Sequence, residues 1–363
     1  MRCLVVQTAY LGDVILTLPL LRLLSDSPEV SWTGAVVTPT GAEFLEGQGA
    51  TDGVILYDKR GADAGAGSLT RAVRRVGNAR ADVALIPHRS FRSALIPFLA
   101  RLRRRVGFDV SGGRALLTDR VPYERSLHEV ERVLALSRPL LSSRGSEGGA
   151  PTLSQDGHRY FRLRVPPGAA ESLAGILSDA GSGEERPMVV VAPGSRWATK
   201  RWHTERFAGV VEQLGRRRGM VAAVVGTAED REACQAVVAG MHTPAMDLSG
   251  RLSVGELVAL VACSRLLLSN DSATAHIAAG LGVPVVAVFG PTVPAQGFAP
   301  YSALARVAES RTPCRPCGRH GGNRCRLGTL ACMSDVRTTD VLRMAEALLS
   351  EGKGEDDCVA RSS

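Results

Sequence analysis

A run of small polar residues, Ser-Asn-Asp-Ser-Ala-Thr-Ala-His at 269–276, interrupts an otherwise apolar stretch in the second half of the chain. An apolar strand precedes the run and a helix is predicted over 272–280, so the run marks a strand-to-helix turn. Asp271 or Ser272 can cap that helix, and helix N-terminal amides bind phosphate well. His276 lies one turn later, on the face that Ser272 occupies. A hydroxyl, amides and an imidazole can converge on one anion; the alternative is a plain capped helix with a packed histidine.

A second loop combines small and basic residues over 192–202, with the sequence Ala-Pro-Gly-Ser-Arg-Trp-Ala-Thr-Lys-Arg-Trp. Gly194 and Ser195 supply small side chains and accessible amides, and Lys200 supplies a point charge. This is the composition of a phosphate-binding loop, although the Walker spacing is absent. We therefore expect Ser195 and Lys200 to bind an anion, while Trp202 packs at the start of the next helix.

Two further turns in the same half follow predicted strands, at 226–230 and 248–252. The carboxylates of Glu229 and Asp230 can accept hydrogen bonds from ribose hydroxyls, or they can simply cap a helix. Backbone groups near Leu252 can contact the edge of a base. Loops that follow parallel strands share one edge of the sheet, which is where open α/β sheets bind ligands.

The first half has its own candidates at two strand ends. Gly12 permits close backbone approach, and a carboxylate there, Asp13, can take a proton from an attacking hydroxyl; its alternative role is a helix cap. Arg89 and Arg92 follow another strand, and four arginines lie within 101–105. Facing a cleft, these arginines would bind an acidic acceptor. Otherwise the 101–105 run is a solvated basic edge.

Four cysteines lie within nineteen residues near the end of the chain: Cys314, Cys317, Cys325 and Cys332. The first pair has the C-x2-C spacing of a metal knuckle, but the second pair is wide for a zinc ribbon. We expect free thiols or a disulfide and assign no metal. A structural zinc or an iron–sulfur centre at these four residues is the alternative.

The elements that must position these residues alternate between strand and helix, which predicts parallel sheets of the α/β class. A chain of 363 residues suits two such domains. We place them at 1–165 and 186–345, with a flexible linker in 141–187 and a disordered tail at 351–363. Strands are expected at 2–8, 32–38, 53–57, 82–86, 188–192, 221–225, 266–269 and 283–289. Helices are expected to end near Ser25 and to cover 167–180, 204–217, 228–240, 253–263 and 272–280.

The charge and the missing motifs limit the function further. The formal net charge is +8, mostly from arginine, so nucleotides, phosphorylated lipids, nucleic acid or an anionic membrane surface are candidate partners. No run of 18 apolar residues predicts a membrane span, and no signal-peptide cleavage site is evident, so we expect a cytoplasmic protein. The fingerprints of dinucleotide oxidoreductases, P-loop ATPases, serine hydrolases and metalloproteases are absent from the sequence.

In combination, these motifs resemble the ADP-heptose:lipopolysaccharide heptosyltransferases of glycosyltransferase family 9, over roughly 1–345. The segments that carry the resemblance are 12–19, 192–202, 269–276 and Gly290-Pro291-Thr292. The resemblance implies a GT-B fold, in which two Rossmann-like domains face each other across a cleft. The first domain would bind a lipid A-linked acidic acceptor at the inner membrane surface, and the second would bind ADP-heptose.

The same resemblance implies inverting transfer without a catalytic metal or a required cofactor. Asp13 matches the general base, and Gly12, Arg89 and Arg92 lie on the acceptor side. The residues on the donor side are Ser195, Lys200, Glu229, Leu252, Asp271, Ser272, Ala273 and His276. Relatives often have glycine where this chain has Ala273. We expect a monomer with no nucleic-acid partner.

Two alternatives remain open. A sibling transferase of the same family, acting on an earlier or later core acceptor or on a protein, would share the donor residues and differ in its product. A basic nucleotide-responsive binding protein would instead bind polyanions with strong salt dependence and release no sugar. The sequence shows no stacking-aromatic platform or recognition helix that would support the second alternative.

Overall fold

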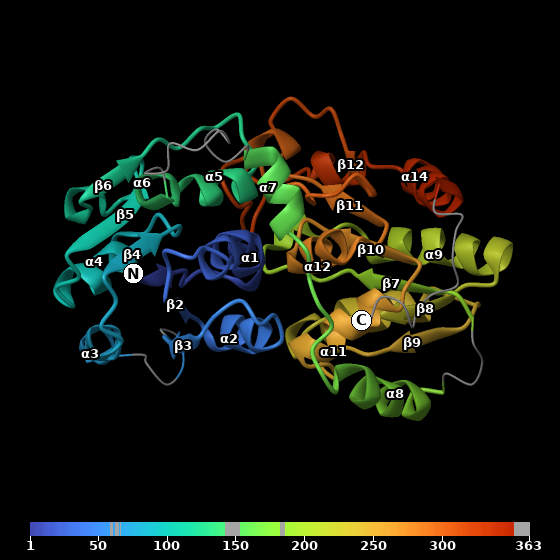
Figure 1. The fold of residues 1–363 in the computed structure, drawn as a ribbon. Coiled ribbons are helices and arrows are strands. Elements are labelled where there is room, and N and C mark those ends of the chain that lie inside the picture. Colours follow the sequence, from blue (N-terminus) through green and yellow to red (C-terminus); the bar gives the residue numbers. More distant parts are fainter. Residues whose placement is uncertain (59–60, 62–64, 66, 142–152, 182–185, 352–363) are drawn as a thin grey trace. The chain divides into compact units, whose positions relative to one another are not determined.

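The computed structural model describes residues 1–58, 61, 65, 67–141, 153–181 and 186–351 (Figure 1). The chain divides into two compact units between Arg162 and Leu163. Two stretches of the linker expected in 141–187 lie outside the described residues, at 142–152 and 182–185. The same holds for 352–363 of the tail expected at 351–363. Each unit is built on its own parallel sheet of six strands.

The first unit has the strand order β3-β2-β1-β4-β5-β6. Its strands are β1 (Arg2–Val6), β2 (Trp32–Val37), β3 (Gly53–Leu56), β4 (Val83–Ile86), β5 (Arg104–Phe108) and β6 (Asp119–Val121). Its helices are α1 (Leu11–Ser25), α2 (Pro39–Glu46), α3 (Ser68–Asn78), α4 (Phe91–Leu99), α5 (Glu129–Ala135), α6 (Arg138–Leu141) and α7 (Leu153–Tyr160). The central strand β1 is apolar and buried from Cys3 to Val6, as a parallel strand covered on both faces must be.

The second unit has the strand order β12-β11-β10-β7-β8-β9. Its strands are β7 (Met188–Ala192), β8 (Val221–Val224), β9 (Ala245–Asp247), β10 (Leu266–Asn270), β11 (Val285–Phe289) and β12 (Ala305–Glu309). Its helices are α8 (Ala169–Asp179), α9 (Thr204–Arg218), α10 (Arg231–Ala239), α11 (Val254–Ala262), α12 (Ala273–Leu281), α13 (Ala331–Ser334) and α14 (Thr338–Glu351).

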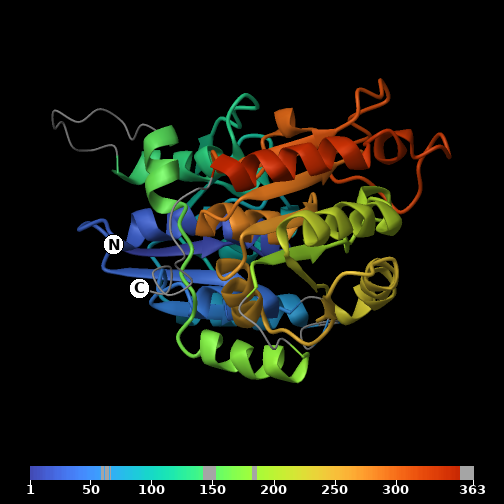
Figure 2. The same cartoon turned by 90° about the vertical axis from the view of Figure 1, so that its right-hand side faces the viewer.

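Apolar side chains of α9 and α14 cover one face of the second sheet and share a buried core with it (Figure 2). Helix α12 is rich in alanine and contains Gly280, so its backbone can approach its neighbours closely. A Cβ added at Gly280 would lie 2.1 Å from the Leu163 side chain, and the amide of Leu163 donates to the Gly280 carbonyl at 2.8 Å. Leu163, the first residue of the second unit, is thus packed against α12 and hydrogen-bonded to it.

In both sheets the strand order reverses beside the first strand of the unit. β1 lies between β2 and β4, and β7 lies between β8 and β10. The loops that leave β1 and β4 run in opposite directions, as do those that leave β7 and β10, and this topological switch opens a crevice at the carboxyl edge of a sheet. The polar motifs at 12–13, 89–92, 192–202 and 269–276 follow these four strands, and those at 226–230 and 248–252 follow β8 and β9.

All eight predicted strands are present, with ends that differ by at most two residues (Figure 1). The helix expected over 167–180 is α8. Strands β5, β6, β9 and β12 were not predicted, because β6 and β9 have only three residues each and β5 and β12 each contain two charged residues. Helix α7 was not predicted either.

Part of the arginine run at 101–105 belongs to strand β5. Arg104 and Arg105 are its first two residues, and successive strand side chains point to opposite faces. Arg104 pairs with Asp119 at 3.0 Å, and Arg105 Nε donates to the Leu116 carbonyl at 2.6 Å. These two arginines therefore make contacts within the first unit, whereas Arg101 and Arg103 are exposed.

Candidate functional site

Asn270, the last residue of β10, lies at the switch point of the second sheet. Its side chain is fully buried, and Nδ2 donates to the Pro193 carbonyl at 2.7 Å. Its Oδ1 accepts from the Trp202 amide at 3.0 Å. Both ends of the loop at 193–202 are thus tied to the neighbouring strand. No role was predicted for Asn270 from the sequence; the available signal was a carboxamide at the end of an apolar strand, where it must find partners.

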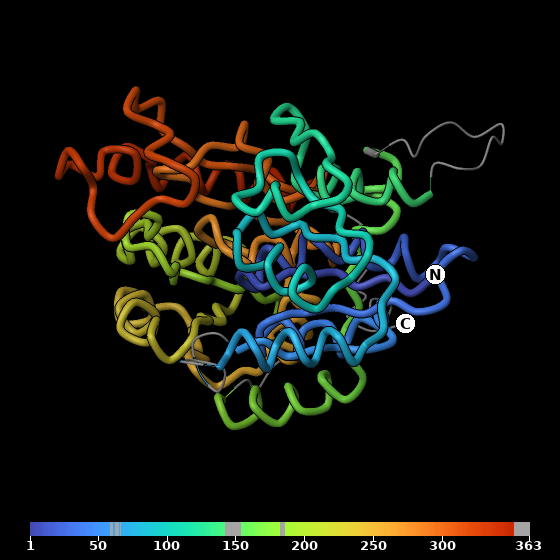
Figure 3. The backbone as a smooth tube through the Cα atoms, turned by 90° about the vertical axis from the view of Figure 1, so that its left-hand side faces the viewer, coloured from blue at the N-terminus to red at the C-terminus, as the bar shows by residue number. Residues whose placement is uncertain are grey.

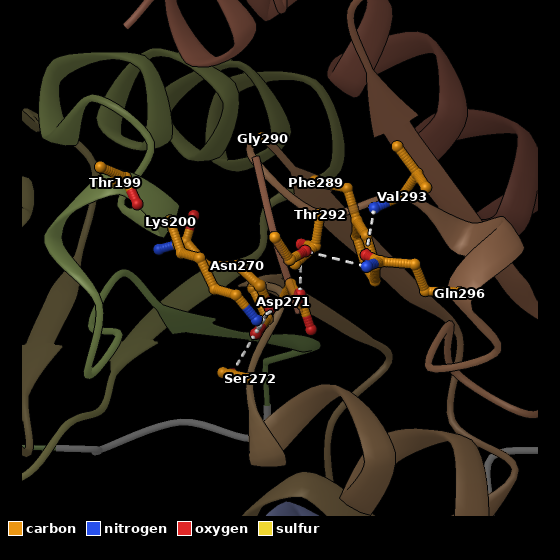
Figure 4. A network of polar contacts seen from close by, with 12 residues as sticks. Thr199, Lys200, Asn270, Asp271, Ser272, Phe289, Gly290, Thr292, Val293 and Gln296 are labelled. Carbon is orange, nitrogen blue, oxygen red and sulfur yellow. Dashed lines mark hydrogen bonds and ion pairs between the residues drawn. The ribbon is translucent and has the colours of Figure 1, made fainter. Parts of the chain in front are cut away.

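The structure brings together Lys200 and Asp271, which the sequence had placed in separate motifs (Figure 4). Lys200 Nζ lies 2.5 Å from Asp271 Oδ2, and both side chains are largely buried, at 12% and 9% exposed. The hydroxyl of Thr292, in the loop after β11, donates to the same oxygen at 2.6 Å. A partly desolvated, hydrogen-bonded pair holds its geometry more firmly than a surface pair does.

The expected helix cap is not made by either candidate side chain. Ser272 occupies the N-cap position of α12 without a capping hydrogen bond, and its hydroxyl lies 2.9 Å from the Ser269 hydroxyl. The carboxylate of Asp271 is held by Lys200 and Thr292 instead. The N-cap side chain thus leaves the amides of the first turn of α12, which starts at Ala273, uncapped.

His276 is buried one turn into α12, at 6% exposed. It follows Ser272, the N-cap residue of the helix, by four residues. The helix dipole adds partial positive charge at this end. The start of α12 and the Lys200 ammonium are therefore two positive features at this switch point.

At the turn after β8, Asp230 makes the capping contacts that were one of the two roles predicted for Glu229 and Asp230. Glu229 is exposed, whereas Asp230 accepts from the Thr227 amide at 3.1 Å and hydroxyl at 2.8 Å. Asp230 also lies against Gly194, where an added Cβ would come within 2.3 Å of its Cγ. Gly194 is therefore required for close approach of the two loops.

Ser195 and Leu252, also predicted on the donor side, lie in the loops after β7 and β9. Ser195 is buried, and its carbonyl accepts from Arg201 Nε at 2.8 Å. Leu252 is half-buried after β9, in a loop whose Gly250 amide donates to the Gly226 carbonyl at 2.8 Å. The loops after β7, β8 and β9 are thus linked along one edge of the sheet.

The cysteine-rich segment, residues 314–332, is hydrogen-bonded to the loops after β7 and β11. The Arg315 side chain is 5% exposed and donates to the carbonyls of Gly290 and Thr292, the latter at 2.7 Å, and to the Glu309 carboxylate at 2.8 Å. Additional bonds join Cys317 to the loop after β11 and Gly322 to the loop after β7. The residue that orients Thr292 is therefore Arg315, which sequence analysis did not single out.

The four cysteines themselves are free thiols, and Cys332 packs in the core of the second unit. Hydrogen bonds from the amides of Leu330 and Leu327 lower the pKa of Cys325, while burial raises the pKa of Cys317 and of Cys332. Across the described residues, no group of three or more His, Cys, Asp or Glu side chains is arranged to hold a metal ion.

In the first unit, Asp13 lies in the first turn of α1, beside the switch between β1 and β4. Its Oδ2 accepts from the Tyr10 amide at 3.3 Å, so the capping role raised from the sequence is present. The Thr17 hydroxyl and the Gln7 side chain hydrogen-bond to each other at 3.0 Å behind it. Gly12, half-buried, precedes Asp13 in the same turn.

A hydroxyl network joins the two loops of this switch. Thr8 follows β1, and its hydroxyl lies 3.0 Å from the Ser93 hydroxyl; His88, after β4, places Nδ1 2.9 Å from the same Ser93 oxygen. These three residues carry no sequence motif, and only the pairing of β1 with β4 brings them together.

Arg89 and Arg92 contact different tyrosines of the first unit. The Arg89 guanidinium stacks 4.3 Å from the ring of Tyr123, which follows β6, whereas Arg92 Nη1 lies 3.4 Å from the hydroxyl of Tyr57, which follows β3. β3 and β6 are the opposite edges of the sheet. Arg89 is thus directed towards the β6 edge of the sheet and Arg92 towards the β3 edge, and their role in acceptor binding stays a prediction.

Two six-stranded parallel sheets, each with polar residues at its switch point, are the architecture of nucleotide-binding transferases. The family model for glycosyltransferase family 9 (heptosyltransferase) matches residues 69–325. The chain belongs to this family and is a glycosyltransferase with the GT-B fold, as its sequence motifs had indicated.

The chain is similar to lipopolysaccharide heptosyltransferase 2 of Salmonella typhimurium, with 30% identity over 77% of this chain and 79% of that one. It is 28% identical to the Escherichia coli protein of the same name, over 85% and 87%. Among solved structures, E. coli ADP-heptose lps heptosyltransferase II has a TM-score of 0.76 at 25% identity, covering 98% of this chain and all of that one. A family 9 glycosyl transferase from Veillonella parvula has a TM-score of 0.81 at 25% identity, covering 97% and 98%. The resemblance to heptosyltransferase II is confirmed.

Proposed function

We propose that this chain transfers heptose from ADP-L-glycero-D-manno-heptose to the inner core of lipopolysaccharide, with heptosyl-Kdo2-lipid A as acceptor. The observation that carries the proposal is the cluster of Lys200, Asp271 and Thr292 beside the uncapped start of α12. The names of its relatives supply the sugar and the pathway.

On the donor side, Lys200 and the amides of α12 bind the diphosphate. Charge develops on the β-phosphate as the bond from the anomeric carbon to its oxygen breaks, and fixed positive groups stabilise that charge. Lys200 is already neutralised by Asp271, so donor binding exchanges one anionic partner for another. The released Asp271 then accepts hydrogen bonds from sugar hydroxyls, with Thr292 holding one of its oxygens.

On the acceptor side, Asp13 acts as the general base. The acceptor hydroxyl attacks the anomeric carbon opposite the leaving ADP, its proton passes to the Asp13 carboxylate, and the configuration inverts. Arg89 binds an acidic group of the acceptor, a Kdo carboxylate or a phosphate. Thr8, His88 and Ser93 hold the loops around this position. No cofactor enters these steps, and the chain acts as a monomer.

The test supplies purified protein with a panel of nucleotide sugars and measures ADP release with and without heptosyl-Kdo2-lipid A. We expect release that requires both ADP-heptose and the acceptor, with a product heavier by one heptose. Release with another nucleotide sugar alone would reject the heptose assignment. Transfer to an earlier or later core acceptor, or to a protein, would instead reject the acceptor assignment.

A further inference from the structure

An apolar stripe lies exposed on helix α4. Phe91, Phe98 and Leu99 are 54%, 43% and 44% exposed, and half-buried Leu95 lies between them. Positions i, i+4, i+7 and i+8 share one face of a helix, so the four side chains form a continuous strip. Val110 is also exposed, in the segment that packs against α4: the Gly112 amide of this segment donates to the Arg89 carbonyl at 3.0 Å.

The positive charge of the chain is concentrated around this stripe. Residues 89–120 hold eight arginines and two aspartates, a formal +6 out of +8 for the whole chain. One of the aspartates, Asp119, is already paired with Arg104. Arg101, Arg103, Arg114 and Arg120 are exposed, and Arg105 lies 5.5 Å from the ring of Phe98. Figure 3 follows this segment, cyan to blue-green, on the side that faces the viewer.

We propose that α4 and residues 101–120 form a docking surface for an anionic lipid bilayer. Exposed Phe and Leu on one helix face, flanked by arginines, suit the boundary between headgroups and acyl chains. The apolar stripe enters that boundary while the guanidinium groups stay with the lipid phosphates. Part of the chain's basic excess thereby finds a partner of opposite charge.

A second copy of the chain fits this surface poorly. A symmetric contact places the same patch on both subunits, so two segments of charge +6 would face each other, and like charges across an interface oppose association. The proposal deepens the proposed function, whose acceptor is lipid-linked, but the binding itself requires no turnover. Of the described helices, none is long and apolar enough to cross a bilayer.

The test measures co-sedimentation of the full chain with phosphatidylcholine vesicles and with phosphatidylcholine–phosphatidylglycerol vesicles. We expect binding to the anionic vesicles that weakens with salt, and little binding to the zwitterionic ones. The double variant Phe98→Ser with Leu99→Ser should lose at least about tenfold in affinity, because both side chains leave the acyl boundary. Arg103→Gln with Arg114→Gln should lose about fivefold per arginine on anionic vesicles.

Matched controls carry the same changes at exposed positions of the second unit. Leu327 is 65% exposed and the Arg343 side chain 76% exposed, so Leu327→Ser and Arg343→Gln should bind vesicles as the parent does. Unchanged melting temperatures would show that every variant is folded. Parental affinity in the Phe98–Leu99 variant, or an equal loss in the controls, would overturn the proposal. Self-association that depends on Phe98 and Leu99 without vesicle binding would overturn it too, in favour of a second copy.

Transfer to a water-soluble, deacylated acceptor separates this proposal from the proposed function. The Phe98–Leu99 variant should keep parental turnover with that acceptor while failing to bind vesicles. If the parent binds anionic vesicles but transfers no heptose to either acceptor, the proposed function fails and the docking surface stands. If the parent transfers heptose but does not bind anionic vesicles, the docking surface is rejected and the proposed function stands.

Discussion

Single side chains in each unit carry distinct parts of the proposed reaction. Asp13 belongs to the first unit and Lys200, Asp271 and Thr292 to the second. Loss of the base and loss of a donor contact should therefore have different kinetic signatures, and substitution at each position tells the two apart.

Asp13→Asn should lower kcat by about 10²- to 10⁴-fold, the usual contribution of general base catalysis. The amide keeps the shape of the side chain but cannot take a proton. ADP affinity, measured by calorimetry, should stay within about twofold, since the residue acts on the acceptor. Asp26→Asn, at the other end of α1, is the control and should keep full turnover. Parental turnover in Asp13→Asn would remove the base assignment.

Thr292→Val should raise KM for ADP-heptose about five- to tenfold, the effect of one hydrogen bond. Valine matches the shape of threonine but cannot donate to Asp271. Thr292→Ser keeps the hydroxyl and should restore the parental KM. If serine and valine behave alike, Thr292 acts through packing, and its hydroxyl does not orient Asp271 for the donor.

At the scale of elements, Asn270 joins strand β10 to both ends of the loop after β7. Asn270→Ala leaves the Pro193 carbonyl and the Trp202 amide unsatisfied, which should cost about 2–4 kcal/mol of unfolding free energy. Urea unfolding measures this cost. Asn323→Ala, at an exposed position, should cost almost nothing. An equal effect of both substitutions would show that the Asn270 bonds do not stabilise the loop.

Helix α9 is tied to the loop before β9 by Glu212, which predicts a pH dependence. Hydrogen bonds from the amides of Thr243 and His242 lower the pKa of Glu212 to about 2, from 4.5. A lowered folded-state pKa stabilises the fold above the unfolded value, and this stability is lost as the pH falls from 4.5 towards 2.

The stability difference between the parent and Glu212→Gln should therefore be largest at neutral pH and shrink below about pH 4.5. Urea unfolding at several pH values measures it. Glu205→Gln is the matched control, because Glu205 lies on the same helix with its side chain 73% exposed. A difference that stays constant down to pH 2 would contradict the role of the Glu212 charge.

At the scale of the whole molecule, each unit has its own switch point, and the proposal assigns the nucleotide to the second. ADP should slow amide hydrogen exchange at 193–200 and 271–276 and leave 7–13 and 87–93 unchanged, since binding protects the amides that it orders. Exchange mass spectrometry measures both regions together. The Lys200→Ala chain should show weaker protection at the same ADP concentration. Protection confined to 7–13 and 87–93 would reverse the assignment of the units.

The sequence by itself determined the α/β class, the eight most apolar strands and the motifs at 12–13, 192–202 and 269–276. Apolar runs that end in small polar residues are local signals, and they can be identified without knowledge of the fold. Strand β5 was not predicted, because its two arginines outnumber its one β-branched residue. Its burial depends on neighbouring strands and helices, which the local sequence pattern does not contain.

Only the tertiary structure decided which polar residues meet. Lys200, Asp271 and Thr292 are far apart in the chain and share one oxygen because β7, β10 and β11 lie in the order that the sheet imposes. The same pairing revealed Asn270 and Arg315 and separated Arg89 from Arg92. Local propensity acts over a few residues, whereas strand order follows from burying both faces of a whole sheet, so these contacts could be seen only once the sheets were assembled.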